Sequence, residues 1–173
     1  VVVTNTTTGC QNTAAVTVNV HALPTPNITG TTTICAGQST TLTATGGTSY
    51  LWSTGETTQS ITPTITNNIT YTVTVTDNKG CTATTNHAVT VIPESVINIS
   101  GDLDICVGET TTLTASGVPS GTYLWSNGQG GASITVSPAS ETTYTVTATD
   151  GNGCQSTGFV TVKVNALPTA SII

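Results

Sequence analysis

Thr70-Tyr71-Thr72-Val73-Thr74-Val75-Thr76 is the stretch that decides the fold, because polar and apolar residues alternate strictly along it. A strand with one face buried and the other in water produces this alternation. Threonine suits the exposed face because it is β-branched and polar, and about a quarter of the chain is threonine. No segment combines helical periodicity with capping residues, so the sequence predicts an all-β fold.

The same pattern returns later in the chain together with its flanking motifs. Tyr-Leu-Trp-Ser at 50–53 reappears at 123–126, and Gly-Cys at 80–81 reappears at 153–154. Counted from cysteine to cysteine, the period is about 71 to 73 residues, the size of one small domain. The predicted organisation has complete repeats at 23–93 and 94–166, the last two strands of a preceding repeat at 1–22, and the first strand of a following repeat at 167–173.

Each repeat is predicted to be a β-sandwich, because turn residues divide it into short strands at a regular spacing. In the first repeat these strands are expected at 27–33, 40–45, 49–53, 59–62, 70–76 and 82–92. The last strand has mainly apolar residues six, eight and ten positions after the late cysteine of each copy, and this face is predicted to be buried. Its members are Val16, Val18 and Val20; His87, Val89 and Val91; and Val160, Val162 and Val164.

Each complete repeat has one early and one late cysteine, so the five cysteines of the chain form two pairs with one left over. We expect one disulfide within each repeat, Cys35 with Cys81 and Cys106 with Cys154, both cysteines lying near one end of the sandwich. Cys10 matches a late cysteine, and its partner is expected in the missing preceding repeat. Closing a loop of about 46 to 48 residues would stabilise a domain by roughly 4 kcal/mol. Such bonds indicate an oxidising, extracellular location.

Charge excludes two classes of partner. The net charge is -6, and Lys79 and Lys163 are the only basic residues of the Lys and Arg type. Nucleic acid binding requires clustered basic side chains, and attraction to an anionic membrane requires the same. No apolar run approaches the ~18 residues of a membrane span, so membrane insertion is not expected.

Three motifs recur in both complete copies: Cys-x-Gly-x-Thr/Ser-x-x-Leu-x-Ala, Tyr-Leu-Trp-Ser-x-Gly, and Thr-Tyr-Thr-Val-Thr-x-Thr-Asp-x-x-Gly-Cys. Together they resemble the tandem immunoglobulin-like and PKD-like repeats of large secreted bacterial surface proteins, such as gliding adhesins and other type IX secretion cargo. The resemblance covers nearly the whole chain. It implies tandem β-sandwich domains in an extracellular fibre, stalk or adhesin, and it brings no catalytic residues to carry over.

Few residues are candidates for a site. Trp52 and Trp125 could stack on sugars, but their repetition on a central strand favours a place in the core. Asp102 and Asp104 form an acidic pair that the first copy lacks, so no repeated calcium site is expected. Neither a nucleophile–base pair nor a set of metal ligands is apparent, so catalysis, metals and cofactors are not expected. Glycosylation sequons begin at Asn27 and Asn98, at matching positions of the two copies.

The repetition favours a structural function, because tandem domains provide length and many weak contacts rather than one catalytic centre. The first interpretation is a segment of a long extracellular surface fibre, filament or adhesin stalk. Its partners would be the neighbouring repeats of the same polypeptide, with self-association into fibres. Two alternatives remain open: an adhesive module that binds carbohydrate or a protein surface through its loops, and the accessory repeats of a secreted enzyme.

Overall fold

The computed structural model describes residues 1–169, which form eighteen β-strands and no helix. These residues divide into two compact units. The first comprises Val1–Gly30, Thr41–Thr62 and Thr70–Ala88, and the second comprises Thr31–Thr40, Pro63–Ile69 and the chain from Val89 onward. The repeat boundaries proposed above stay a prediction, and most of the strand expected at 167–173 lies outside the described residues.

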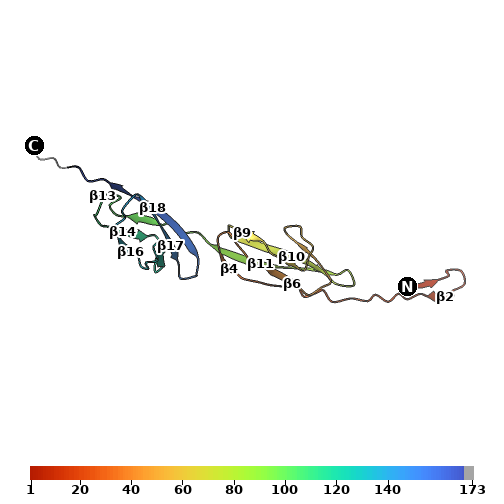
Figure 1. Cartoon of the computed structure of the whole chain (residues 1–173). Helices are drawn as coiled ribbons and strands as arrows, with labels where there is room; N and C mark the ends of the chain where they lie inside the picture. Colours follow the sequence, from red (N-terminus) through yellow and green to blue (C-terminus); the bar gives the residue numbers. More distant parts are fainter. Residues whose placement is uncertain (170–173) are drawn as a thin grey trace, which may run out of the picture. The chain divides into compact units, whose positions relative to one another are not determined.

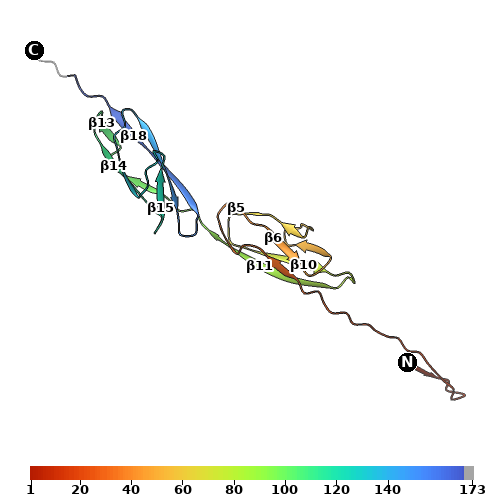
Figure 2. The ribbon, with the colours of Figure 1, turned by 60° about the horizontal axis from the view of Figure 1, so that its bottom comes forward.

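The second repeat is a sandwich of two sheets, visible in Figures 1 and 2. One sheet has the strand order β13-β18-β17-β15 and the other has the order β12-β14-β16. The strands are β12 (Asn98–Ser100), β13 (Asp104–Cys106), β14 (Thr111–Ser116), β15 (Thr122–Trp125), β16 (Ser133–Val136), β17 (Thr142–Thr149) and β18 (Gln155–Asn165). This arrangement is immunoglobulin-like, with the first strand divided between the two sheets.

The core of the second repeat is made by the inward positions that the alternation predicts. Tyr144, Val146 and Ala148 of β17 are buried, and the threonines between them lie on the other face. Tyr144 and Val146 form one apolar cluster with the following buried residues of the other strands: Ile105, Leu113, Ala115, Trp125, Ile134, Val136 and Val162. The predicted all-β sandwich is therefore confirmed.

The first repeat has the same strand order in its main sheets, β4-β11-β10-β7 and β3-β6-β8, and a small additional sheet, β5-β9. Its strands are β3 (Asn27–Thr29), β4 (Thr33–Cys35), β5 (Gln38–Ser39), β6 (Leu42–Thr45), β7 (Ser49–Trp52), β8 (Ser60–Ile61), β9 (Thr64–Ile65), β10 (Ile69–Thr76) and β11 (Thr82–Ile92). In β10, the deciding stretch, Tyr71, Val73 and Val75 are buried as predicted.

Both tryptophans lie in the core. Trp52 and Trp125 are each 2% exposed, and each indole Nε1–H donates a hydrogen bond to a backbone carbonyl, of Thr58 at 2.8 Å and of Gly131 at 3.0 Å. A buried indole N–H needs such a partner. Neither ring is available to stack on a sugar.

The single strand expected at 27–33 is wrong, because this segment is two strands in two different sheets. β3 pairs antiparallel with β6, and β4 pairs parallel with β11. The segment changes sheets at Gly30, where an added Cβ would lie 2.8 Å from the carbonyl oxygen of Thr41. Gly101 stands at the same place in the second repeat, and an added Cβ there would lie 2.5 Å from the carbonyl oxygen of Thr112. The consequence is that β4 and β13 lie beside the last strand of their own repeat.

The predicted burial of the last-strand face holds for the two complete copies at their central positions. Val89 is 1% exposed and Val162 is fully buried. It is wrong for Val16, Val18 and Val20, which are 87%, 78% and 92% exposed. The segment containing them follows a hairpin of β1 (Val2–Thr4) and β2 (Gln11–Thr13) and has no strand pairing among the described residues (Figure 1). An apolar strand face is buried only where a second sheet covers it.

Threonine and serine hydroxyls pair across the exposed face of each sandwich. Thr43 Oγ1 lies 2.9 Å from Ser60 Oγ, and at the matching place Thr114 Oγ1 lies 2.9 Å from Ser133 Oγ. A second matching pair joins Thr41 with Thr62 at 3.2 Å and Thr112 with Thr135 at 3.3 Å. Cross-strand hydroxyl pairs of this kind stabilise a sheet. The charge-poor outer face therefore makes part of its hydrogen bonds internally.

Gly117 is a position where only glycine fits, and it provides a test of the fold. Its φ is +115°, and an added Cβ would overlap the carbonyl oxygen of Val96. Gly128 is a matched control, because its φ is +84° but nothing lies within 4 Å of an added Cβ. We expect Gly128→Ala to lower the free energy of unfolding by about 1 kcal/mol, from backbone strain alone.

Gly117→Ala should lower the free energy of unfolding by roughly 2 to 4 kcal/mol, because the Val96 backbone must also move. Urea denaturation of both variants, followed by tryptophan fluorescence, measures the difference. Equal losses in the two variants would contradict the close approach of Val96 to Gly117.

Candidate functional site

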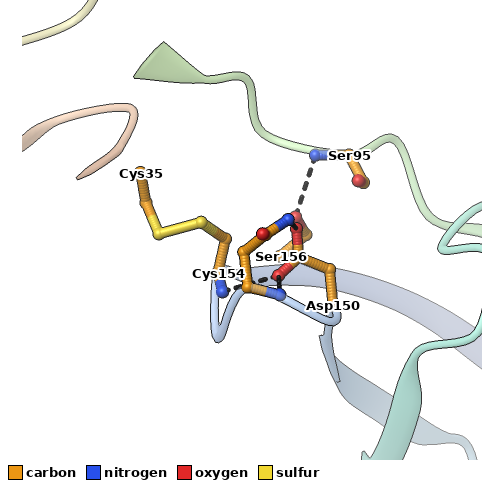
Figure 3. The surroundings of a disulfide bond; sticks show 6 residues. Cys35, Ser95, Asp150, Cys154 and Ser156 are labelled. Atoms are coloured by element: carbon orange, nitrogen blue, oxygen red, sulfur yellow. Dashed lines mark hydrogen bonds between the residues drawn. A yellow bond between two sulfur atoms is a disulfide. The ribbon is translucent and has the colours of Figure 1, made fainter. Parts of the chain in front are cut away.

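A disulfide joins Cys35 of the first repeat to Cys154 of the second, and their Cα atoms lie 5.5 Å apart. Both residues belong to the second compact unit, and Figure 3 shows the bond with its surroundings. The expected pairs within each repeat, Cys35 with Cys81 and Cys106 with Cys154, are therefore wrong. We expected one disulfide within each sandwich. Instead, the disulfide between Cys35 and Cys154 links the first repeat to the second.

The length of the last strand explains the correction. In the second repeat, Cys106 pairs with Asn165 at the trailing end of β18, where this strand finishes. Cys154 precedes β18 at its leading end, where the strand begins. β18 has 11 residues, which at ~3.3 Å each is roughly 36 Å. A disulfide requires Cα atoms within about 7 Å, so these two cysteines cannot bond to each other.

The first repeat has the same register. Cys35 pairs with Ile92 at the trailing end of β11, and Cys81 precedes Thr82 at its leading end. The parallel pairing of β4 with β11 thus carries the early cysteine to the end of the domain from which the chain continues to the next repeat. The expectation that both cysteines lie near one end failed because it treated 27–33 as one strand.

Three cysteines remain as free thiols. Cys10 is exposed, whereas Cys81 and Cys106 are half-buried. We expected each of these cysteines to pair within its own repeat. The expected partners were an early cysteine of the preceding repeat for Cys10, Cys35 for Cys81 and Cys154 for Cys106. For Cys81 and Cys106 that assignment is contradicted by the bond between Cys35 and Cys154.

A turn held by an aspartate places Cys154. The carboxylate Oδ1 of Asp150 accepts hydrogen bonds from the backbone N–H groups of Asn152 and Cys154, both at 2.8 Å. The backbone N–H of Asp150 donates to the carbonyl of Cys154 at 2.9 Å and closes the turn. Figure 3 shows Asp150 beside Cys154, with the hydrogen bonds between them dashed. The sequence patterns above did not predict this role, although Asp stands four residues before the late cysteine in both complete copies.

A second contact lies beside the disulfide. The backbone N–H of Ser95 donates to Oγ of Ser156 at 2.9 Å, and Ser156 is buried (Figure 3). The cavity here has a volume of about 170 Å³ and is lined by Cys35, Ala36, Ile92, Pro93, Glu94, Cys154 and Gln155. Ligand pockets are usually about 300 Å³ or larger, so this space is too small for a typical organic ligand.

In the acidic pair of the second repeat, Asp104 contacts two side chains of the same repeat. Asp104 forms an ion pair with Lys163 at 3.5 Å and accepts a hydrogen bond from Asn165. Both charged side chains are 59% exposed, so the pair contributes little to stability. Within residues 1–169 no group of three or more His, Cys, Asp or Glu side chains is placed to hold a metal ion.

The two predicted glycosylation sites, Asn27 and Asn98, are exposed at the starts of β3 and β12. Their modification stays a prediction.

No helix long and apolar enough to cross a membrane is present in the part of the chain that the structure describes.

The Asp150 turn gives a test by pH. Hydrogen bonds from the backbone N–H groups, that of Cys154 first, lower the pKa of Asp150 below its ordinary value of 3.8. A depressed folded-state pKa means that the turn is stabilised above pH ~4 and loses this stabilisation as the pH falls through the folded-state pKa. We expect the amide resonance of Cys154 to titrate with a midpoint below 3.8.

The control is Asp150→Asn, which keeps the accepting oxygen and removes the titration. Asn5 already shows the arrangement, because its Oδ1 accepts from the backbone N–H of Thr7 at 2.9 Å in the turn before Cys10. An amide midpoint at or above 3.8, or an unchanged titration in Asp150→Asn, would contradict the described turn.

Comparisons with known proteins found structural similarities at low sequence identity. The sequence matches no family profile, and no curated protein is significantly similar to it. A calcium-stabilised adhesin with which an Antarctic bacterium binds ice is 16% identical, with a TM-score of 0.47 over 98% of this chain and 56% of that one. A chain comprising the three N-terminal domains of the outer capsid protein Hoc of bacteriophage RB49 is 18% identical, with a TM-score of 0.45 over 83% of this chain and 59% of that one.

The titin I-band fragment I67–I69 is 14% identical, with a TM-score of 0.42 over 85% of this chain and 67% of that one. The chain thus spans less than three fifths of the solved adhesin chain and of the three-domain Hoc chain.

Proposed function

We propose that this chain is a tension-bearing segment of a long extracellular fibre, filament or adhesin stalk. The observation that carries the proposal is the disulfide between Cys35 and Cys154, which joins residues of consecutive repeats. These repeats are already joined by the peptide at Pro93 and Glu94, so the disulfide is a second covalent connection. An oxidising location outside the cell is the setting in which such a bond persists.

The second connection changes how a pulling force would pass along the chain. A force applied to the two termini reaches Cys35 and then crosses the disulfide to Cys154. The 119-residue span between these cysteines lies in a closed loop and carries no net tension. Even if the sandwiches unfold, the ends can separate only by the residues outside this loop. A segment of this kind keeps its length under load.

The disulfide also stabilises the fold itself. Closing a loop that spans 119 residues restricts the unfolded chain by about 5 kcal/mol in the loop-entropy model. Domains of ~70 residues have small cores and depend on such reinforcement. The charge-poor faces, with threonine hydroxyls paired across strands, support a spacer more than a ligand-binding surface.

Single-molecule pulling on the oxidised chain tests the proposal. With the disulfide intact, unfolding should release none of the 119-residue span, which is about 400 Å of extended chain. Addition of reductant, or the variant Cys35→Ser, should restore that length. Cys106→Ser is the matched control, because it removes a half-buried thiol that is not bonded to Cys35 or Cys154. An oxidised chain that extends as far as the reduced chain would overturn the tension-bearing function.

A further inference from the structure

The two early cysteines occupy the same backbone position in their repeats. Cys35 is opposite Ile92 in the parallel pairing of β4 with β11, and Cys106 is opposite Asn165 in the parallel pairing of β13 with β18. The next residue in each copy donates its backbone N–H to the carbonyl of that same partner, both at 2.9 Å. The bonded Cys35 and the free Cys106 therefore have the same backbone surroundings, at the trailing end of each domain.

The late cysteines also share one local structure. The backbone N–H of Cys81 donates to Oδ1 of Asp77 at 2.9 Å, as that of Cys154 does to Asp150 at 2.8 Å. The backbone N–H of Asp77 donates to the carbonyl of Cys81 at 3.0 Å and closes the same turn. Cys81 is half-buried whereas the bonded Cys154 is 7% exposed, so the position becomes covered where a bridge forms.

The turn before Cys10 is a longer version of this structure. The backbone N–H of Asn5 donates to the carbonyl of Cys10 at 2.8 Å, so an Asx residue again closes the turn. In both complete repeats the late cysteine is held at the leading end of the last strand, and the early cysteine lies at the trailing end. A domain with one cysteine at each end can bridge to the domain on either side but not to itself.

We propose that Cys106, Cys81 and Cys10 are sites of further disulfides identical in kind to the one between Cys35 and Cys154. Cys106 bonds to the late cysteine of a repeat that follows it, and Cys81 bonds to the early cysteine of a repeat that precedes it. Cys10 bonds to the early cysteine of the repeat before its own. The bridges then overlap along the array, each one joining two consecutive domains. This inference rests on the proposed function as a segment of a tandem array.

The chemistry of each bridge is thiol–disulfide exchange. A thiol of one repeat attacks an external disulfide, either a small molecule or an oxidoreductase, and forms a mixed disulfide with loss of one external thiol. The thiol of the neighbouring repeat then attacks the mixed disulfide and releases the second external thiol. The two protein thiols are oxidised to one S–S bond, and the external disulfide is reduced to two thiols.

The chain extended by one repeat tests the inference. The linker Ala-Leu-Pro-Thr at 166–169 repeats the linker at 22–25, so residues 30–93 appended after Ile173 continue the array in phase. The extended chain has seven cysteines, five of its own and two from the added copies of Cys35 and Cys81. We expect a bond between Cys106 and the added copy of Cys81, in addition to the bond between Cys35 and Cys154.

Counting free thiols in the oxidised, denatured protein separates the outcomes. Two overlapping bridges leave three of the seven cysteines free, because each bridge uses two. The bridge between Cys35 and Cys154 alone leaves five free, which would overturn this inference and leave the proposed function standing. Pairing within each repeat leaves one free and would overturn both. The variant Cys106→Ser should raise the count from three to four, since it removes one partner of the second bridge and frees the added copy of Cys81.

Discussion

The pairing of a short early strand with the last strand of its own domain is the constraint on which the rest of the structure depends. Because β4 and β13 run parallel to β11 and β18, the early cysteine is carried to the trailing end of the domain. The late cysteine is fixed at the leading end by an Asp-closed turn. The 11 residues of the last strand keep the two apart, so the disulfide must be made between domains.

This placement differs from the usual reinforcement of an immunoglobulin-like sandwich. In antibody domains a disulfide joins the two sheets of one domain beside the core tryptophan. Here Trp52 and Trp125 are buried in their cores without such a bond, and the one described disulfide joins Cys35 with Cys154. The covalent reinforcement has moved from the core to the joint, where it limits extension of the chain as well as stabilising the fold. In the proposed function, the succession of domains matters more than any single binding surface.

Much of the fold could be predicted from the sequence, because period-two alternation specifies which face of a strand is buried. The strand at 82–92 has the predicted bounds, and Tyr71, Val73 and Val75 are inward as expected. The disulfide could not be predicted, because pairing depends on the direction in which the short strand β4 runs beside β11, which alternation does not encode. The sequence indicates the break in the first strand only indirectly, through Gly30 and Gly101, which stand at the same place in both copies. The valines at 16, 18 and 20 were predicted to be buried but are exposed. An alternating face is buried only where a second sheet covers it.

Disulfide mapping by mass spectrometry of the oxidised, unreduced chain tests the central claim most directly. After free thiols are alkylated and the chain is digested, we expect a cross-linked peptide pair containing Cys35 and Cys154. We also expect alkylation at Cys10, Cys81 and Cys106. A cross-link between Cys35 and Cys81, or between Cys106 and Cys154, would contradict the bridge between consecutive domains.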